Sequence, residues 1–297
     1  MLDRFDGKIG DVEIASVLDC TILGETAQAL FPDFDRDAIR PHEHWLCPHH
    51  FDAETGRIPM PVQSFVLRTK HHNILIDTCV GNDKERPGPG LGEFHRLTTD
   101  YLGRLAKLGL RPEDIDYVMC THLHGDHIGW NTRLINGRWE PTFPNARYIM
   151  SRTELEATRS EAEASTFVAL KNCFEDSIRP VLDAGKADFV DGVHEMLDVI
   201  TLRPAPGHSP GNMRIELRSL GEVGVFAGDI VHSPIQIPFW EWSSRLCWDR
   251  QMSTHARREL LEFCATDNAL LIPGHFAAPH VARIRETAGR FDLEFGW

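Results

Sequence analysis

Four side chains of the kinds that bind metal ions stand within six consecutive residues of the stretch "THLHGDHIGW": His122, His124, Asp126 and His127. Histidine is the commonest metal ligand among side chains and aspartate is a hard oxygen donor, so this density predicts a bound cation. The apolar run "DYVMC" precedes the cluster and predicts a buried strand. The cluster is therefore expected on a loop at the end of this strand, and other parts of the chain must supply the remaining ligands.

The local spacing predicts how these four side chains are shared. Side chains alternate between the two faces of an extended segment, so His122 and His124 point the same way and can grip one ion. Gly125 is expected to permit a turn that swings Asp126 and His127 toward a second ion.

Three later stretches, each after a predicted strand, carry further candidate ligands. They are "PAPGHSPGN" with His208, "FAGDIVHS" with Asp229, and "LLIPGHF" with His275. Loops held by a rigid sheet are where binding sites are commonly built. His280 lies five residues after His275 and is an alternative to it. The four signals, in this order, predict one metal centre.

Charge and composition limit the classes of partner. The formal net charge of −13 opposes binding to nucleic acid, whose affinity for proteins rests on Lys and Arg, so the expected partner is a small molecule. No apolar run is long enough to cross a membrane, and the N-terminus lacks the layout of a secretory signal. The seven cysteines are scattered without a C-x-x-C pair, which predicts reduced thiols and a cytoplasmic location.

Hydrophobic periodicity predicts alternating strands and helices in the first half of the chain. A hairpin is expected from strands 62–69 and 73–78, followed by a helix over 97–108 that stops at Gly109. A buried strand ends before the histidine cluster, another covers 146–151, and a helix begins at a Ser151 cap with Glu154 in the capping-box position. A further helix is expected over 165–178.

The second half repeats this order of strands and then helices. Strands are expected over 194–206, 212–219 and 222–230, then a helix over 250–267, a strand over 269–275 and a closing helix. No linker separates the halves. We therefore expect one domain, 1–297, with two sheets inside, helices outside, and residues 1–60 as an N-terminal extension or capping region.

The ordered run H-x-H-x-D-H, "PGHSPG", "GD" and "PGH" resembles the metallo-β-lactamase superfamily over about residues 60–280. This resemblance implies an α/β (α+β) fold, a four-layer αβ/βα sandwich with a metal pair at one edge. It implies that His122, His124 and His208 bind the first ion. Asp126, His127 and His275 would bind the second, with Asp229 bridging both. Two divalent ions are expected, zinc first, with iron, manganese or cobalt also suited to this donor set.

The resemblance implies hydrolysis by a hydroxide held between the two metals. The stretch "GDIVHSPIQ" is most similar to the acyl-homoserine lactonases and methyl-parathion-type hydrolases, so the expected substrate is a lactone, carboxylic ester or organophosphate ester with an apolar portion. Two other groups of the superfamily fit this sequence less well. Class B β-lactamases carry Cys or Ser at the position of Asp229, and flavodiiron proteins carry Glu at the position of His124. The alternatives are a mononuclear iron oxidoreductase resembling persulfide dioxygenases, or a thioester hydrolase.

Two residues are candidates for proton transfer. Many acyl-homoserine lactonases carry a tyrosine at the position of His232, which suggests that His232 contacts the substrate oxygen or protonates the leaving group. The other interpretation is that His232 supports Asp229 through a hydrogen bond. If His232 is not the acid, Asp126 or a metal-bound water is.

Two aromatic or histidine-rich segments remain. Phe239, Trp240 and Trp242, with Trp248 nearby, form either an apolar wall for the substrate or a surface buried beneath a neighbouring helix or subunit. The stretch "RPHEHWLCPHHF" suggests a third metal site, a capping loop near the pocket, or a contact in a homodimer; its candidate ligands are His42, His44, Cys47, His49 and His50.

Overall fold

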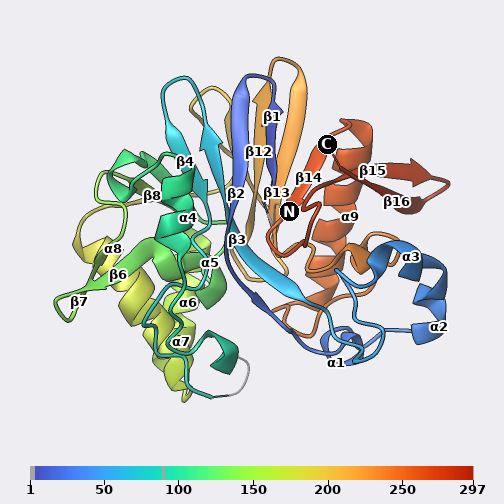
Figure 1. Ribbon diagram of the computed structural model, residues 1–297, viewed down its shortest axis with the longest axis horizontal. Coiled ribbons are helices and arrows are strands. Elements are labelled where there is room, and N and C mark those ends of the chain that lie inside the picture. The colour runs from blue at the N-terminus through green and yellow to red at the C-terminus, as the bar shows by residue number, and fades with distance from the viewer. Residues whose placement is uncertain (1–3, 89–90, 297) are drawn as a thin grey trace. The chain divides into compact units, whose positions relative to one another are not determined.

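The computed structural model describes residues 4–88 and 91–296 and contains two compact units (Figure 1). The central unit comprises Asp11–Cys20 and Val62–Gly192. The terminal unit comprises Met1–Gly10, Thr21–Pro61 and Val193–Trp297. The predicted single domain over 1–297, with 1–60 as an extension, stays a prediction, although part of that extension is a sheet strand.

The central unit is built on a mixed sheet whose strands follow the order β2-β3-β4-β5-β8-β9. The predicted hairpin is confirmed, because β3 and β4 pair antiparallel with Phe65 opposite Ile76. Strands β4, β5 and β8 run parallel and are mostly buried, as sheets covered on both faces are. The bounds are β2 Val12–Ile22, β3 Met60–Arg68, β4 Asn73–Ile76, β5 Tyr117–Met119, β8 Arg147–Ser151 and β9 Ala187–Val190.

The three predicted helices of the central unit are present as α4, α6 and α7 with η5, although α4 and α7 begin a few residues later than expected, and α5 and α8 were not predicted. The Ser151 hydroxyl accepts a hydrogen bond from the backbone N–H of Glu154, which confirms the predicted cap of α6. In α4, the Tyr101 hydroxyl donates to Ser64 Oγ on β3 at 2.8 Å and so fixes the helix to the sheet. The helices are α4 Tyr101–Lys107, α5 Gly125–Ile128, α6 Arg152–Ala164, α7 Val168–Cys173, the π-helical turn η5 Phe174–Ile178 and α8 Arg179–Asp183; short 3-10 turns are η2 Gly92–Phe94, η3 Pro112–Asp114 and η4 Gly129–Asn131.

A small hairpin that was not predicted follows the histidine cluster. Strands β6 (Thr132–Ile135) and β7 (Arg138–Pro141) pair antiparallel around Asn136 and Gly137, whose φ angles are 50° and 80°. An Asn-Gly pair is the typical signal of a two-residue turn with positive φ at both positions, so this hairpin could have been found from the sequence.

The terminal unit contains a second sheet, of order β10-β11-β12-β13-β14-β15-β16. The segment expected as one strand over 194–206 is instead a hairpin, because Leu197 and Asp198 adopt φ of 55° and 61° and reverse the chain. The strands are β10 His194–Met196, β11 Ile200–Pro204, β12 Met213–Ser219, β13 Glu222–Gly228, β14 Leu270–Pro273, β15 Ala282–Thr287 and β16 Arg290–Phe295; β1 Asp6–Ile9 also belongs to this unit's residues.

The prediction of a closing helix is wrong. Strands β15 and β16 occupy that region and pair antiparallel around Ala288 and Gly289, which both have positive φ. Ala282 and Ile284 are buried while the arginine between them is less so, which is the period of two that a half-buried strand requires. The predicted helix α9 (Arg250–Thr266) is confirmed, and its Leu260 and Cys264 pack in one core cluster with Leu271 and Ile284 of the sheet.

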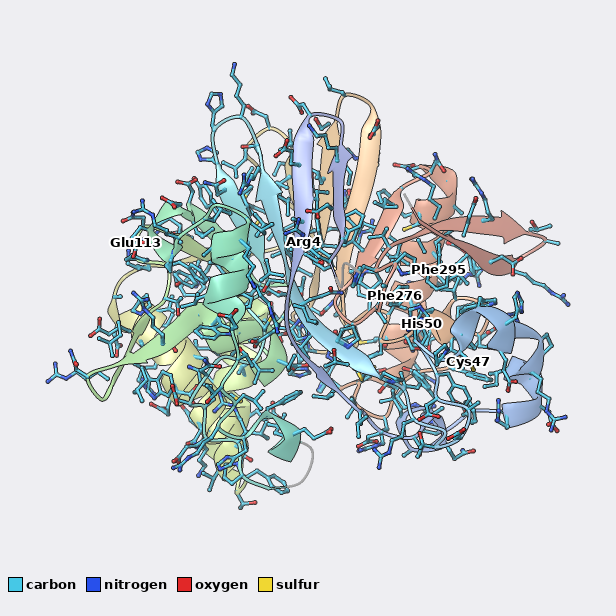
Figure 2. The ribbon with its side chains drawn as sticks, in the orientation of Figure 1. Arg4, Cys47, His50, Glu113, Phe276 and Phe295 are labelled. Carbon is cyan, nitrogen blue, oxygen red and sulfur yellow. The ribbon has the colours of Figure 1, made fainter. Side chains whose placement is uncertain are left out.

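Residues 21–61 form short helices that pack within the terminal unit. Leu30, Phe31, Leu46 and Phe51 share a core cluster with Ile235. The His50 ring stacks on Phe295 with centroids 5.0 Å apart and planes 6° apart, and it also contacts Phe276 (Figure 2). The helices are α1 Ala27–Leu30, α2 Arg36–Ile39, the 3-10 turn η1 Arg40–His42 and α3 Glu43–Leu46.

The idea of a third metal site in this segment finds no support. The His42 ring packs edge-on against Trp45 and Phe239, and His50 packs on the two phenylalanines. Within residues 4–88 and 91–296, the groups of His, Cys, Asp and Glu close enough to share an ion do not include any residue of 42–50. His42 and His50 thus serve as aromatic packing partners.

Over the same described residues, every helix is too short or too polar to cross a lipid bilayer.

Candidate metal centre

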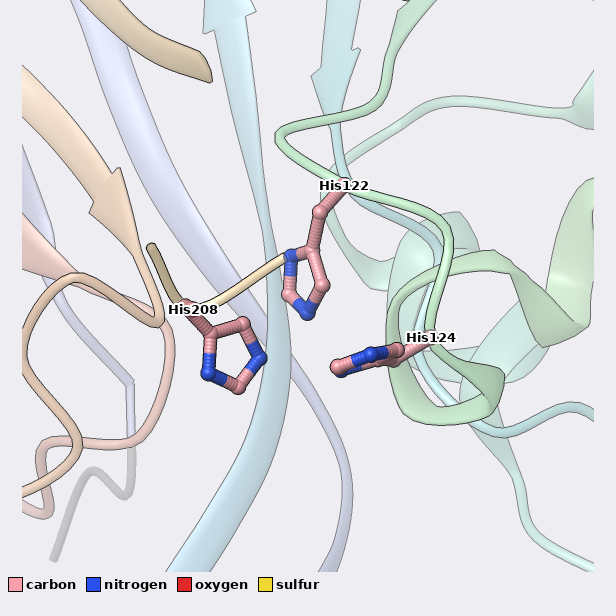
Figure 3. A group of neighbouring side chains, drawn as sticks. All are labelled: His122, His124 and His208. Carbon is pink, nitrogen blue, oxygen red and sulfur yellow. The ribbon is translucent and has the colours of Figure 1, made fainter. Parts of the chain in front are cut away.

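The central unit brings four predicted ligands together in what we call the central half-site: His122, His124, Asp126 and His127. The rings of His122 and His124, drawn in Figure 3, lie with centroids 4.6 Å apart. The rings of His122 and His127 are 4.0 Å apart, and Asp126 Oδ2 is 3.8 Å from His127 Nε2. Strand β5 ends at Met119, so all four side chains leave the carboxyl end of a parallel strand.

Gly125 has a different role from the one expected. It is the first residue of helix α5, with His124 as the N-cap, and its φ is not in the left-handed region. A Cβ at Gly125 would lie 2.9 Å from Cys173 Sγ, and one at Gly129 would lie 1.7 Å from the carbonyl oxygen of Val80. The glycines therefore allow the short helix that carries Asp126 and His127 to pack closely against its surroundings.

Asp77 orients two of these histidines, and sequence reasoning missed it. Its Oδ2 lies 2.9 Å from Nδ1 of His127, and it accepts hydrogen bonds from the Thr121 backbone N–H at 2.7 Å and hydroxyl at 2.8 Å. Thr121 Oγ1 is in turn 3.1 Å from Nδ1 of His122. Because both Nδ1 atoms are engaged, Nε2 is the nitrogen that each ring would offer to an ion. The signal was present, since Asp77 ends the strand sequence "NILID".

Glu154 is the second residue that was missed. Its carboxylate, on helix α6, accepts the backbone N–H of Leu123 at 3.1 Å, between His122 and His124 in the chain. The side chain is almost fully buried. The sequence predicted only its capping position, and nothing in the local sequence points to this contact, which joins residues 31 positions apart.

The terminal unit brings three predicted ligands, His208, Asp229 and His275, together with His232, the candidate for proton transfer. We call these four residues the terminal half-site. Asp229 Oδ2 lies 3.4 Å from His208 Nε2 and 3.6 Å from His232 Nε2. Its other oxygen, Oδ1, lies 3.1 Å from His275 Nε2. The four side chains are at most 5% exposed. Each follows the end of a strand: β11, β13 or β14.

His275 and His280, the two alternatives for one ligand position, make different contacts. His275 faces Asp229 through Nε2, while its Nδ1 lies 2.9 Å from the carbonyl oxygen of Pro61. His280 Nδ1 instead lies 3.1 Å from the carbonyl oxygen of Phe276. The contact with Asp229 favours His275, and its role as a ligand stays a prediction.

His232 is buried beside the other residues of the terminal half-site. Its ring centroid is 4.8 Å from that of His208, and its backbone N–H donates to Gln236 Oε1 at 2.8 Å. Gln236 Nε2 also donates to the carbonyl oxygen of Trp242, so the side chain of Gln236 ties the Asp229–His232 turn to the aromatic loop.

The predicted aromatic wall is partly covered by the terminal unit itself. Phe239 and Trp242 stack with centroids 4.2 Å apart, and Trp242 contacts Phe34 of the N-terminal segment. The Trp240 ring lies beneath the guanidinium of Arg258, and Trp248 is 62% exposed. The structure thus gives Phe239 and Trp242 a packing role; a contact of Phe239, Trp240 or Trp242 with substrate stays a prediction.

A buried cation behind the terminal half-site was also missed. Arg257 of α9 donates through Nη1 to the carbonyl oxygen of Ile230 at 3.0 Å and through Nε to that of Trp240 at 2.9 Å. Burial lowers the pKa of Arg257 to about 10, so the guanidinium keeps its charge at neutral pH. It ties the residue after Asp229 to the aromatic loop. A lone Arg in a helical pattern carries no such signal in the sequence.

The donors of the two half-sites fit divalent metal ions. Together they offer imidazole nitrogens and carboxylate oxygens and no thiolate, a combination suited to zinc, iron, manganese or cobalt. The Nδ1 atoms of His122, His127 and His275 are each held by an oxygen, which is the orientation typical of metal-binding histidines.

Comparison with known proteins places this geometry in a family. The model of the metallo-beta-lactamase superfamily matches residues 57–275, which include every predicted ligand. An N-acyl homoserine lactonase of Bacillus cereus is 30% identical over 169 residues, 52% of this chain and 58% of that protein. The lactonase AiiB of Agrobacterium fabrum is 28% identical over 108 residues, 32% of this chain and 37% of that protein. The chain thus matches 58% and 37% of the lengths of these two curated relatives.

Two solved structures share the fold almost from end to end. AidC, a dizinc quorum-quenching lactonase solved with N-hexanoyl-homoserine product, has a TM-score of 0.77 at 24% identity and covers 98% of this chain and 96% of its own. The hydrolase AbOPH has a TM-score of 0.81 at 22% identity and covers 100% of this chain and 99% of its own. The predicted fold class is confirmed. Because the family model spans most of the sequence, the chain belongs to the metallo-beta-lactamase superfamily.

Proposed function

We propose that the protein is a metal-dependent hydrolase that holds two divalent ions, with zinc as the expected metal, and cleaves a lactone, carboxylic ester or organophosphate ester. One observation carries this proposal: Asp229 lies within 3.1–3.6 Å of the Nε2 atoms of three buried histidines. A carboxylate with an imidazole near each of its oxygens is suited to bridging two cations. The relatives named as lactonases support the substrate class.

The ligand assignment follows the family pattern residue by residue. His122, His124 and His208 are proposed to bind one ion, and Asp126, His127 and His275 the other, with Asp229 shared. When bound, such an ion pair lowers the pKa of water toward roughly 7 and polarises the oxygen of the scissile bond. Asp77 and Pro61 hold the outer nitrogens of His127 and His275, so the ligand nitrogens are oriented before an ion binds.

The remaining chemistry falls to this chain's own side chains. His232, beside Asp229, is proposed to give a proton to the leaving oxygen or to support Asp229, and Asp126 is the alternative acid. Trp240, together with Phe239 and Trp242, is proposed to line the apolar part of the substrate. The acidic chain disfavours a polyanionic substrate, which leaves a neutral or weakly anionic small molecule.

Metal analysis combined with a substrate panel tests the proposal. The gently purified full chain should contain about two equivalents of metal, and it should hydrolyse at least one class among acyl lactones, aryl esters and phosphotriesters. Asp229→Ala should lose both metal and turnover. If the protein hydrolyses thioesters and none of the panel substrates, the proposed substrate class is wrong. If it holds one equivalent of iron and consumes oxygen in the presence of a thiol, it is an oxidoreductase and not a hydrolase.

We also propose that the protein works in a reducing compartment such as the cytoplasm. All seven cysteines are free thiols, and four of them are buried: Cys79, Cys120, Cys173 and Cys264. Association of two copies stays a prediction, and gel filtration with light scattering on the full chain decides it.

A further inference from the structure

The loop that carries His208 is fixed by a short segment that precedes helix α9. The backbone N–H of Trp248 donates to the carbonyl oxygen of His208, and that of Asp249 donates to Gly207, both at 2.9 Å. Asp249 also caps α9 by accepting the backbone N–H of Met252. Residues 207–208 and 248–249 are therefore joined side by side, and the first turn of α9 anchors them.

Gly207 makes this close approach sterically feasible. Its φ is +138°, and a Cβ there would lie 2.2 Å from the backbone nitrogen of Ser253 in α9. A residue with a side chain would push the His208 loop away from the helix. The position of the His208 backbone is thus set by α9, which leaves the orientation of its ring to be fixed by a side chain.

Cys247 provides that contact. Its Sγ lies 3.8 Å from Nδ1 of His208, while Nε2 on the other side of the ring lies 3.4 Å from Asp229 Oδ2. The Cys247 thiol donates to Ser253 Oγ at 3.2 Å. With its own hydrogen directed to Ser253, the sulfur offers a lone pair to an N–H on Nδ1 of His208. That tautomer leaves the Nε2 lone pair directed toward Asp229.

We propose that Cys247 is a positioning residue that holds the His208 ring with Nε2 toward Asp229, and that it raises the affinity of the site for the ion that His208 binds. This inference rests on the proposed metal site, and it adds a residue that the family motif does not contain. Outer partners of metal-binding histidines typically change metal affinity or activity by about 10–100-fold.

A direct metal–sulfur bond is the competing interpretation. Ligand atoms of His208, His232 and Cys247 all lie within 4.8 Å of one another, and these three could hold an ion by themselves. The two interpretations differ in chemistry, because a thiolate ligand gives an intense sulfur-to-metal charge-transfer band with cobalt(II), whereas a thiol that only accepts a hydrogen bond gives none.

The test uses Cys247→Ala and Cys247→Ser in the full chain, with Cys264→Ala as the matched control. Cys264 is another thiol of the terminal unit, but it packs in the core on α9. Zinc affinity is measured by competition with a chromophoric chelator, the cobalt(II)-loaded proteins are examined by absorption, and thermal unfolding of the metal-free proteins reports folding.

We expect Cys247→Ala to weaken the binding of one of the two zinc ions about 10–100-fold. Cys247→Ser should recover most of that affinity, because its hydroxyl is also a hydrogen-bond acceptor. Cys264→Ala should bind zinc like the parent protein. The cobalt spectrum of the parent should lack a thiolate band. Unchanged zinc affinity in Cys247→Ala overturns the proposal, and so does a thiolate band that this substitution removes.

The same measurements separate this inference from the proposed function. Selective loss of one zinc in Cys247→Ala would uphold the positioning role even if every ester and lactone in the panel were refused. Hydrolysis with unaltered zinc affinity would uphold the function and overturn the role of Cys247. A parent chain that binds no divalent metal would overturn both.

Discussion

Oδ2 of Asp77 lies 2.9 Å from Nδ1 of His127, and the two residues are 50 positions apart in the chain. The same carboxylate accepts both hydrogen bonds from Thr121, whose hydroxyl reaches His122. One buried side chain at the end of β4 thereby sets the orientation of two rings in the central half-site. Removing the Asp77 side chain should therefore lower the metal affinity of the proposed site even though every proposed ligand is kept.

We expect Asp77→Ala to reduce metal affinity or kcat/KM about 10–100-fold, the usual effect of removing the outer partner of a metal-binding histidine. Metal content after dialysis and steady-state kinetics measure it. Asp188→Ala is the control, because Asp188 pairs with Arg147 on the surface of the same unit. Equal losses in the two variants would show that the effect of Asp77 is general destabilisation.

Replacing a ligand should have a much larger effect. We expect Asp126→Ala and His208→Ala each to lose metal and nearly all turnover, because each removes a donor and alters the charge of the site. Elemental analysis and activity assays, with circular dichroism as a check on folding, measure this. Full activity with two metals bound in either variant would contradict the ligand assignment.

The role of His232 can be read from its dependence on the leaving group. If it protonates the leaving oxygen, His232→Ala should keep both metals and lower kcat by about 10²–10⁴ for esters with a poor alkoxide leaving group. Nitrophenyl esters, whose leaving group needs no proton, should change little. If metal content falls and all substrates slow alike, His232 instead supports Asp229, which lies 3.6 Å away.

The aromatic loop yields a prediction about KM. Trp240→Ala should raise KM for bulky apolar substrates and leave small substrates nearly unaffected. The lost contact would stabilise the bound substrate and the transition state equally, so kcat should change little. A series of substrates with increasing acyl length measures this. Phe239→Ala is the comparison, because Phe239 stacks on Trp242 and packs on the N-terminal segment, and its loss should lower thermal stability. A KM change in Trp240→Ala that is independent of acyl length would assign Trp240 a structural role.

His50 should make folding stability depend on pH. Burial lowers the pKa of His50 from 6.5 to about 4, so between these values the unfolded chain binds a proton that the folded protein excludes. The contribution is fully present above pH 6.5 and is lost as the pH falls toward 4, by up to about 3 kcal/mol in the free energy of unfolding.

Urea unfolding of the metal-free protein at several pH values tests this dependence. His50→Phe should keep the stacking on Phe295 and lose less stability than the parent between pH 6.5 and 4. His255→Phe, at an exposed position of α9, should follow the parent. Parallel curves for the parent and His50→Phe would show that another group is responsible.

The sequence was sufficient for the family and for the elements with strong local patterns, while the ligand set stays a prediction. The order of His122, His124, Asp126, His127, His208, Asp229 and His275 identifies the family, because a metal site needs fixed donor types at strand ends. The hairpin of β3 and β4 and the helix α9 were also predicted, because their apolar residues recur with the periods of strand and helix.

Only the tertiary structure revealed Asp77, Glu154 and Cys247, and only it placed β15 and β16 where a helix was expected. Each of these residues acts through a partner 31 to 50 positions away in the chain, so no local spacing records the contact. The last two strands pair with each other within the second sheet. Their backbone hydrogen bonds and the burial of Ala282 and Ile284 outweigh the helical pattern of the local sequence, and these long-range terms cannot be read from a short sequence segment.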